Sequence, residues 1–418
     1  MIDKIQNSSV ASTSQVSSPP HKPVYASSIP KTQSLYESYV LSPTRTLVRP
    51  LFFPLFNKLP LKLEEQMTKE KQFFESFWDP KAPPYPELSH HKKIKDNFTH
   101  KNEDFAITLK GKAYMVRCSV IESKNYIFGK ACYNVVHVLG ITSTLNNTIM
   151  HTYPLLASYL DLKGKKSLPA RFILVNQYSI YSADGSIYKP ETLSEAGLIH
   201  SETLKVIEER YGTIHQLLSY SLGTIVTAAA LKFFHKDPPE NTCSLTGRIT
   251  PVKPSDESTL KATRAFKSLP KNIIFDRGPS SIEKLSSRYT GGSILLPLAR
   301  LSDWDVNLGK EIADFIQNCP ENAPSITIVN VLQDHRFHGD VTLLDHPDIK
   351  RLTAEKKVTS ILLDITLQSL HENAQHSFSL GNWYGSHVVE GYKEQKFLQK
   401  DQSLATAIIK NSIPSRSN

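Results

Sequence analysis

A serine between small residues, in the segment Ser219-Tyr220-Ser221-Leu222-Gly223, is the first candidate for chemistry in this chain of 418 residues. It follows a short apolar segment, residues 214–218, and precedes an alanine-rich stretch, residues 224–231. A nucleophile on a tight strand-to-helix turn exposes its Oγ, and the residues two before and two after it must be small. The pattern predicts Ser221 as a nucleophile and the N–H of Leu222, at the helix N-terminus, as a donor to an oxyanion. Ser219 stands where glycine is usual, but it is still small.

A nucleophilic serine needs a general base and an acid that orients this base. On turns of this kind the partners follow along the chain in the order serine, acid, histidine, at the ends of later strands. Residues 326–332 read as a buried strand, and Asp334 comes directly after it. We therefore expect Asp334 to be the acid, and Asp340 is the alternative.

The general base should be a histidine in a mobile loop. His387 follows Gly385 and Ser386 near the end of the chain, and it is preferred to His376 and His371. The ordered set of Ser221, an acid and a later histidine supports the choice, since the chain has 15 histidines and most histidines are structural or solvated.

The second oxyanion donor should come from the loop after the third strand. Residues 134–139 read as a buried strand, and Gly140 would let the backbone approach a substrate. The N–H of Ile141 is therefore the predicted second donor.

Strands alternate with helices from about residue 104 onward, after an antiparallel hairpin around Lys110-Gly111-Lys112. This order predicts an α/β sheet that is mostly parallel after an antiparallel start and is flanked by helices. The predicted strands are residues 105–109, 113–120, 134–139, 171–176, 214–220, 272–275 and 326–332, and the predicted helices are residues 148–160, 194–211, 223–235 and 355–373. Two long connections, residues 237–270 and 287–320, predict a mobile loop and a lid over an acyl or aromatic pocket, respectively.

Several segments together resemble the chlamydial CHLPS family, which is similar to α/β-hydrolases. They cover much of residues 105–395, and the block Asp276–Ser281 is the most specific of them; the others are Ser219–Gly223 with the helix after it, Trp304, Asn176–Tyr178 and Leu193–Gly197. The resemblance implies an α/β-hydrolase-like fold and a bacterial origin in Chlamydia. It implies no substrate.

The ends of the chain differ from its body. Residues 1–45 hold 11 serines and predict a disordered leader, because such a segment buries too little apolar surface to order itself. Residues 46–103 predict an accessory segment and linker, with a helix over residues 61–77 that packs on the body or contacts a membrane or a host protein. Residues 104–395 form the predicted hydrolase-like domain, and residues 396–418 a tail.

The charge is diffuse, with 49 Lys and Arg against 40 Asp and Glu. The only basic cluster, His90–Lys95, predicts a solvated loop or, alternatively, a phosphate- or membrane-surface patch. No interleaving of aromatic and basic residues suggests a nucleic-acid partner. The start of the chain has no secretory signal, so we expect a cytoplasmic protein of a bacterium, or one secreted by a route that needs no such signal.

Two hypotheses for function follow. The first is a serine hydrolase of the esterase, lipase or thioesterase type that uses Ser221, His387 and Asp334 and needs no metal or organic cofactor. The second is a catalytically silent, hydrolase-like binding protein, since a fold does not decide a function.

Overall fold

The computed structural model describes the sheet, most of its helices and a few isolated residues outside them. The described residues are 78, 90–138, 152, 155–157, 159, 160, 168–234, 266–287, 296, 297, 300, 303–319, 323–331 and 341–363. Among them, no helix is long and apolar enough to cross a membrane.

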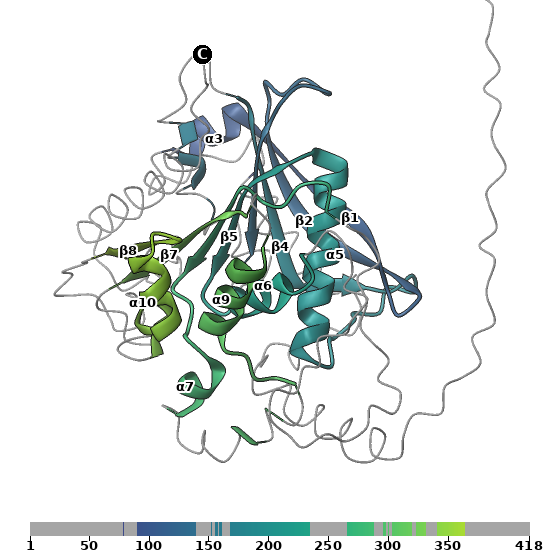
Figure 1. Ribbon diagram of the computed structural model, residues 1–418. Coiled ribbons are helices and arrows are strands. Elements are labelled where there is room, and N and C mark those ends of the chain that lie inside the picture. The colour runs from purple at the N-terminus through teal and green to yellow at the C-terminus, as the bar shows by residue number, and fades with distance from the viewer. Residues whose placement is uncertain are drawn as a thin grey trace, which may run out of the picture.

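An eight-stranded sheet forms the centre of the molecule, in the order β1-β2-β4-β3-β5-β6-β7-β8 (Figure 1). Strands β1 and β2 pair antiparallel, β2 pairs antiparallel with β4, and all later neighbours pair in parallel. The strands are β1 (Phe98–Leu109), β2 (Lys112–Ser123), β3 (Tyr133–Val138), β4 (Ala170–Tyr181), β5 (Ile214–Tyr220), β6 (Asn272–Asp276), β7 (Ser325–Val331) and β8 (Val358–Leu363). The predicted α/β-hydrolase-like sheet, mostly parallel after an antiparallel start, is confirmed.

The predicted hairpin between β1 and β2 is confirmed, but its turn has two residues, because Lys112 already belongs to β2. Lys110 and Gly111 both have left-handed backbone angles, with φ of 50° and 75°. Two such residues in succession are typical of the tight turn whose twist matches that of the flanking strands.

Helices cover one face of the sheet in a continuous layer, in which α5 contacts α6, α6 contacts α9, and α9 contacts α10 (Figure 1). The described helices are α3 (His91–Asn97), α5 (Leu193–Tyr211), α6 (Gly223–Leu231), α7 (Ile282–Ser287), α9 (Leu308–Asn318), α10 (Pro347–Ala354) and the 3-10 helix η4 (Leu343–Asp345). On the other face, the rings of Phe98, Tyr159 and Phe172 pack edge-on or tilted against one another.

The central strands are therefore buried on both faces. All six residues of β3 and all five of β6 are buried, and side chains alternate between the two sides. Val136, Ile173 and Leu217 belong to the core beneath the helix layer, whereas Phe172 points to the opposite side. Such near-continuous apolar segments are the reason why these strands could be recognised in the sequence.

Three predictions about elements were wrong. The basic cluster and the end of the expected linker form α3 and the start of β1, because Ile94 and Phe98 are apolar anchors with exposures of 0% and 1%. The expected helix over residues 355–373 is instead the strand β8 up to Leu363, in keeping with the β-branched Val358, Thr359 and Ile361.

The prediction of a lid over residues 287–320 was also wrong for the second half of this segment. Residues 308–318 form α9, which packs on α6 and has Ile312 and Phe315 buried. Trp304 is 1% exposed and belongs to the core, so this part of the connection is a structural layer.

Candidate active site

Ser221 lies on a tight turn between the central strand β5 and the helix α6. Its φ is 52°, a left-handed angle that costs a residue with a Cβ about 1–2 kcal/mol. Ser221 and Leu222 are partly exposed, whereas Tyr220 before them and Gly223 after them are buried. The predicted strand, turn and helix are confirmed, and the turn lifts Ser221 out of the core at the carboxyl end of β5.

Backbone hydrogen bonds hold the turn from two sides. The N–H of Ser221 donates to the carbonyl of Asp276 on the neighbouring strand β6, at 2.9 Å. The carbonyl of Ser221 accepts from the N–H of Thr224, at 3.0 Å, and from its hydroxyl, at 2.5 Å. Both polar backbone groups of the strained residue are thus satisfied, which keeps the turn in one conformation.

A fully buried ion pair lies directly beside the turn. Nε and Nη2 of Arg277 donate to the two carboxylate oxygens of Asp276, both at 2.9 Å, and neither side chain is exposed. The guanidinium lies 4.6 Å from the ring centroid of Tyr220, the last residue of β5. Arg277 also has a left-handed φ of 49°, and its N–H donates to Val329 on β7. The pair therefore links β5, β6 and β7 at the edge where Ser221 emerges.

Gly278 leaves room for Thr224 at the start of α6. A Cβ at position 278 would lie 2.5 Å from Oγ1 of Thr224 and 3.0 Å from its Cβ. No side chain fits there unless the threonine moves, so glycine is required by this close approach.

A second polar contact lies beneath the turn and explains the departure at position 219. The hydroxyl of Ser219 is 2.7 Å from that of Thr227 on α6, which lies 3.4 Å from Nε2 of His200 on α5. All three side chains are buried. Burial lowers the pKa of His200 to about 3, so the ring is neutral near pH 7. Ser219 is thus small enough for the turn and ties β5 to both helices.

Of the predicted site residues, the structure describes Ser221 and Leu222. Leu222 is the residue that caps the N-terminus of α6, as the prediction of an oxyanion donor requires. The other predicted residues lie outside the described part of the chain: Ile141, Asp334, Asp340, His371, His376 and His387.

The register of the sheet places β7, the strand that precedes the predicted acid in the sequence, near β5. Strands β5, β6 and β7 are parallel neighbours, so their carboxyl ends share one edge, and β7 lies about 10 Å from β5. Asp334 follows Val331, the last residue of β7, by three positions, which span at most about 10 Å. Asp334 itself lies outside the described residues, and its role stays a prediction.

Sequence reasoning missed the residues that position the turn, namely Thr224, Asp276, Arg277 and Gly278. Their contacts join segments that are far apart in the chain, and no local pattern signals them. The one available signal was the block Asp276–Ser281, which carried the family resemblance but had no role assigned to it.

The sequence matches no model of a known protein family and no curated protein. Among solved structures, the chain is similar to an acylaminoacyl peptidase from Pyrococcus horikoshii (16% identity, 78% of this chain and 44% of that chain, TM-score 0.43). It is also similar to a thermostable esterase from Pseudomonas putida (10% identity, 89% and 98%, TM-score 0.39) and to a lipase/esterase from Lactobacillus plantarum (11% identity, 73% and 99%, TM-score 0.37). The chain spans less than half of the peptidase. At such identities and scores these likenesses say nothing of activity, and the α/β-hydrolase-like fold rests on the strand order and on the turn after β5.

Proposed function

We propose that the protein is a serine hydrolase that transfers the acyl group of an ester or a thioester to water. The observation that carries this proposal is the left-handed φ of 52° at Ser221, a partly exposed serine between a central parallel strand and a buried helix. A strained turn at this place in an α/β sheet is how such enzymes present a nucleophile.

In this proposal Ser221 attacks the acyl carbonyl, while His387 takes the proton of the hydroxyl and returns it to the leaving group. Asp334 orients the imidazole and stabilises its charged form. The N–H groups of Leu222 and Ile141 donate to the oxyanion, and the positive end of α6 adds to this stabilisation. Water then releases the acyl group by the same steps.

A fluorophosphonate probe tests the proposal directly, since it labels activated serines. We expect the wild-type protein to be labelled and Ser221→Ala to be unlabelled. Ser119→Ala is the matched control, because the Ser119 hydroxyl is 2.7 Å from Nε2 of His100, outside the proposed site. Burial lowers the pKa of His100 to about 4, which makes it a weak base, so the control should be labelled like the wild type.

Absence of labelling in a folded wild-type protein, or equal labelling of Ser221→Ala, would overturn the proposal in favour of a silent binding protein. If labelling behaves as expected, His387→Ala and Asp334→Ala each identify a partner. Each should slow the hydrolysis of p-nitrophenyl acetate by about a thousandfold or more.

A further inference from the structure

Two large apolar side chains are exposed at the apex of the loop between β2 and β3. Ile127 is 65% exposed and Phe128 is 94% exposed. The N–H of Lys130 donates to the carbonyl of Ile127, at 3.0 Å, and Gly129 has a φ of 79°, so these four residues form a tight turn. We call residues 124–131 the tip loop. Both apolar side chains therefore lie within this turn and are exposed.

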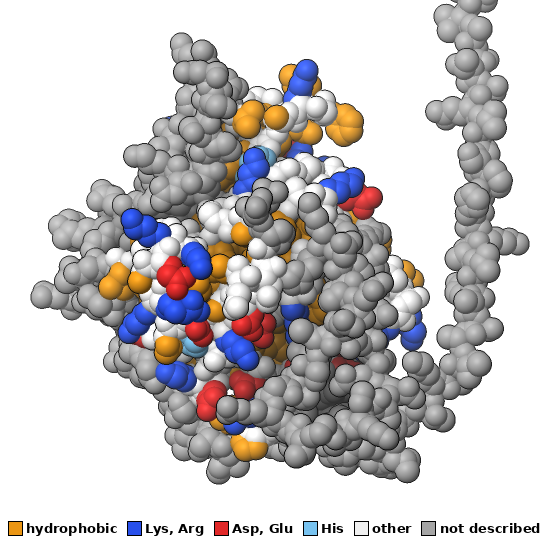
Figure 2. Space-filling model, in the orientation of Figure 1, with side chains coloured by type: hydrophobic (Ala, Val, Ile, Leu, Met, Phe, Trp, Pro, Cys, Tyr) orange, Lys and Arg blue, Asp and Glu red, His pale blue; other side chains and the backbone are white. Residues whose placement is uncertain are grey.

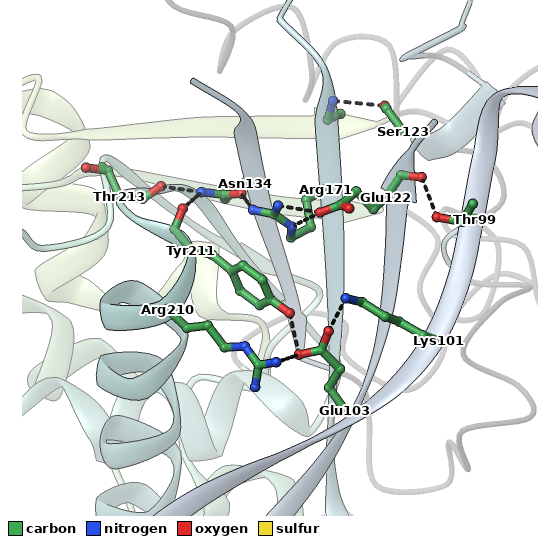
Figure 3. A network of polar contacts seen from close by, with 11 residues as sticks. Thr99, Lys101, Glu103, Glu122, Ser123, Asn134, Arg171, Arg210, Tyr211 and Thr213 are labelled. Carbon is green, nitrogen blue, oxygen red and sulfur yellow. Dashed lines mark hydrogen bonds and ion pairs between the residues drawn. The ribbon is translucent and has the colours of Figure 1, made fainter. Parts of the chain in front are cut away.

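Contacts with the sheet anchor the base of the tip loop. The guanidinium of Arg171 lies 4.6 Å from the ring centroid of Tyr126, within the loop. Arg171 also pairs with Glu122 and donates to Asn134, at 2.9 Å, and Figure 3 shows it between these two residues. The same figure shows a second group of contacts, in which Tyr211 and two cations surround Glu103. The loop therefore rests on a buried polar network.

Exposed lysines lie on the tip loop and on the helix that is bonded to its base. These four lysines come from the loop and from α3, the helix made by the basic cluster: Lys92, Lys93, Lys124 and Lys130. The two segments are joined, because Nζ of Lys124 donates to the carbonyl of Lys95 and its N–H donates to that of Asn97, both at 2.8 Å. Asp96 is the exposed acidic residue among them. In Figure 2, apolar and basic side chains lie together at the top of the molecule, the end at which Figure 1 shows α3.

We propose that the tip loop and α3 dock on the surface of an anionic lipid bilayer. Ile127 and Phe128 would enter the boundary between headgroups and acyl chains, and the four lysines would lie at the level of the headgroups. Apolar residues flanked by cations are the arrangement that binds such a surface. Two apolar residues are too few for the core of a stable protein interface, which buries about 800 Å² on each partner. Binding to an anionic bilayer instead combines a small buried apolar area with the attraction of cations to the headgroups. This inference does not rest on the proposed hydrolase activity.

Co-sedimentation of the full-length protein with vesicles tests it. We expect binding to phosphatidylcholine vesicles that contain phosphatidylserine and much weaker binding to pure phosphatidylcholine. Ile127→Ser with Phe128→Ser should weaken binding by at least about tenfold, as expected for the loss of one fully buried aromatic side chain. Replacing Lys92, Lys93 and Lys130 by Gln should weaken it by about fivefold for each charge. In the variant Phe128→Trp, the fluorescence emission of the new tryptophan should shift to the blue when vesicles are added.

Matched controls change the same residue types elsewhere on the surface. Leu362→Ser alters an apolar side chain that is 55% exposed on β8, and Lys112→Gln with Lys356→Gln removes exposed charges. These variants should bind vesicles like the wild type. The proposal is overturned if the wild type ignores both kinds of vesicle, if the controls lose binding as much as the tip variants, or if soluble glycerophosphoserine binds as tightly as the vesicles. It is also overturned if the tip variants change only the association of the protein with itself.

Discussion

Gly278→Ala should disturb the turn at Ser221 without touching the serine itself. The new methyl group would lie 2.5 Å from Oγ1 of Thr224, closer than such atoms can approach, and in tight contact with its Cβ and Cγ2 at 3.0 and 3.1 Å. Overpacking of this kind costs about 1–3 kcal/mol. If Thr224 moves aside, its hydroxyl also loses the bond to the carbonyl of Ser221, which adds about 1 kcal/mol. The restricted backbone of alanine in the unfolded chain returns about 0.5 kcal/mol. The free energy of unfolding should therefore fall by about 1.5–3.5 kcal/mol.

Urea unfolding followed by circular dichroism measures this change by linear extrapolation. The control is Gly278→Ala made in the Thr224→Ala variant, which lacks Oγ1 and Cγ2. There the substitution should lower the free energy of unfolding by about 1 kcal/mol or less, because only the contact with Cβ remains. Fluorophosphonate labelling of Ser221 should be slower in Gly278→Ala than in the wild type. A cost below about 0.5 kcal/mol, or an equal cost with and without the threonine side chain, would refute the reasoning.

Three further predictions concern the surroundings of the turn. Ser219→Gly should lower the free energy of unfolding by about 1–2 kcal/mol in urea titrations, because it removes the bond to Thr227 and places glycine in a central strand. Burial lowers the pKa of His200 from 6.5, the ordinary value of histidine, to about 3 in the folded protein. Between these two pH values only the unfolded chain binds the proton, so the free energy of unfolding falls as the pH falls through this range. His200→Gln should reduce this slope by about 1.4 kcal/mol per pH unit in urea titrations at stepped pH, and an unchanged slope would contradict the assignment. Asp276→Asn should cost about 3–5 kcal/mol by the same method, because it removes the carboxylate charge that faces the buried guanidinium of Arg277, and a cost below about 1 kcal/mol would contradict that account.

The parts of the fold that could be predicted are those with a strong local pattern. Strand β5 has the predicted bounds, and β3 and α6 lie where the apolar segments placed them. Each of these elements is buried on all sides, so nearly every one of its residues belongs to the apolar segment that predicted it. Strand β8 lies at the edge of the sheet, and its exposed Leu362 made the segment look like the apolar stripe of a helix. Helix α3 is polar apart from Ile94, and only His91 and Ile94 are buried, too few residues to show a helical period.

The site could be predicted only as far as local sterics reach. Small residues around Ser221 predicted the turn, because a tight strand-to-helix connection excludes larger ones. The contacts of Thr224 with Gly278 and of the Ser221 backbone with Asp276 join the turn and the start of α6 to the end of β6. Their spacing in the sequence is set by the length of a connection that carries no pattern. The roles of Asp334 and His387 stay predictions.

The tip loop and Ser221 lie at opposite ends of the parallel strands, since the loop precedes β3 and the serine follows β5. Six residues of β3 alone separate these ends by about 20 Å. A molecule held on a bilayer by its tip would turn its serine toward the water, well beyond the reach of an acyl chain that remains in the lipid. Attachment would then serve to keep the protein near a membrane, and its substrates would have to arrive in solution, as soluble esters or thioesters.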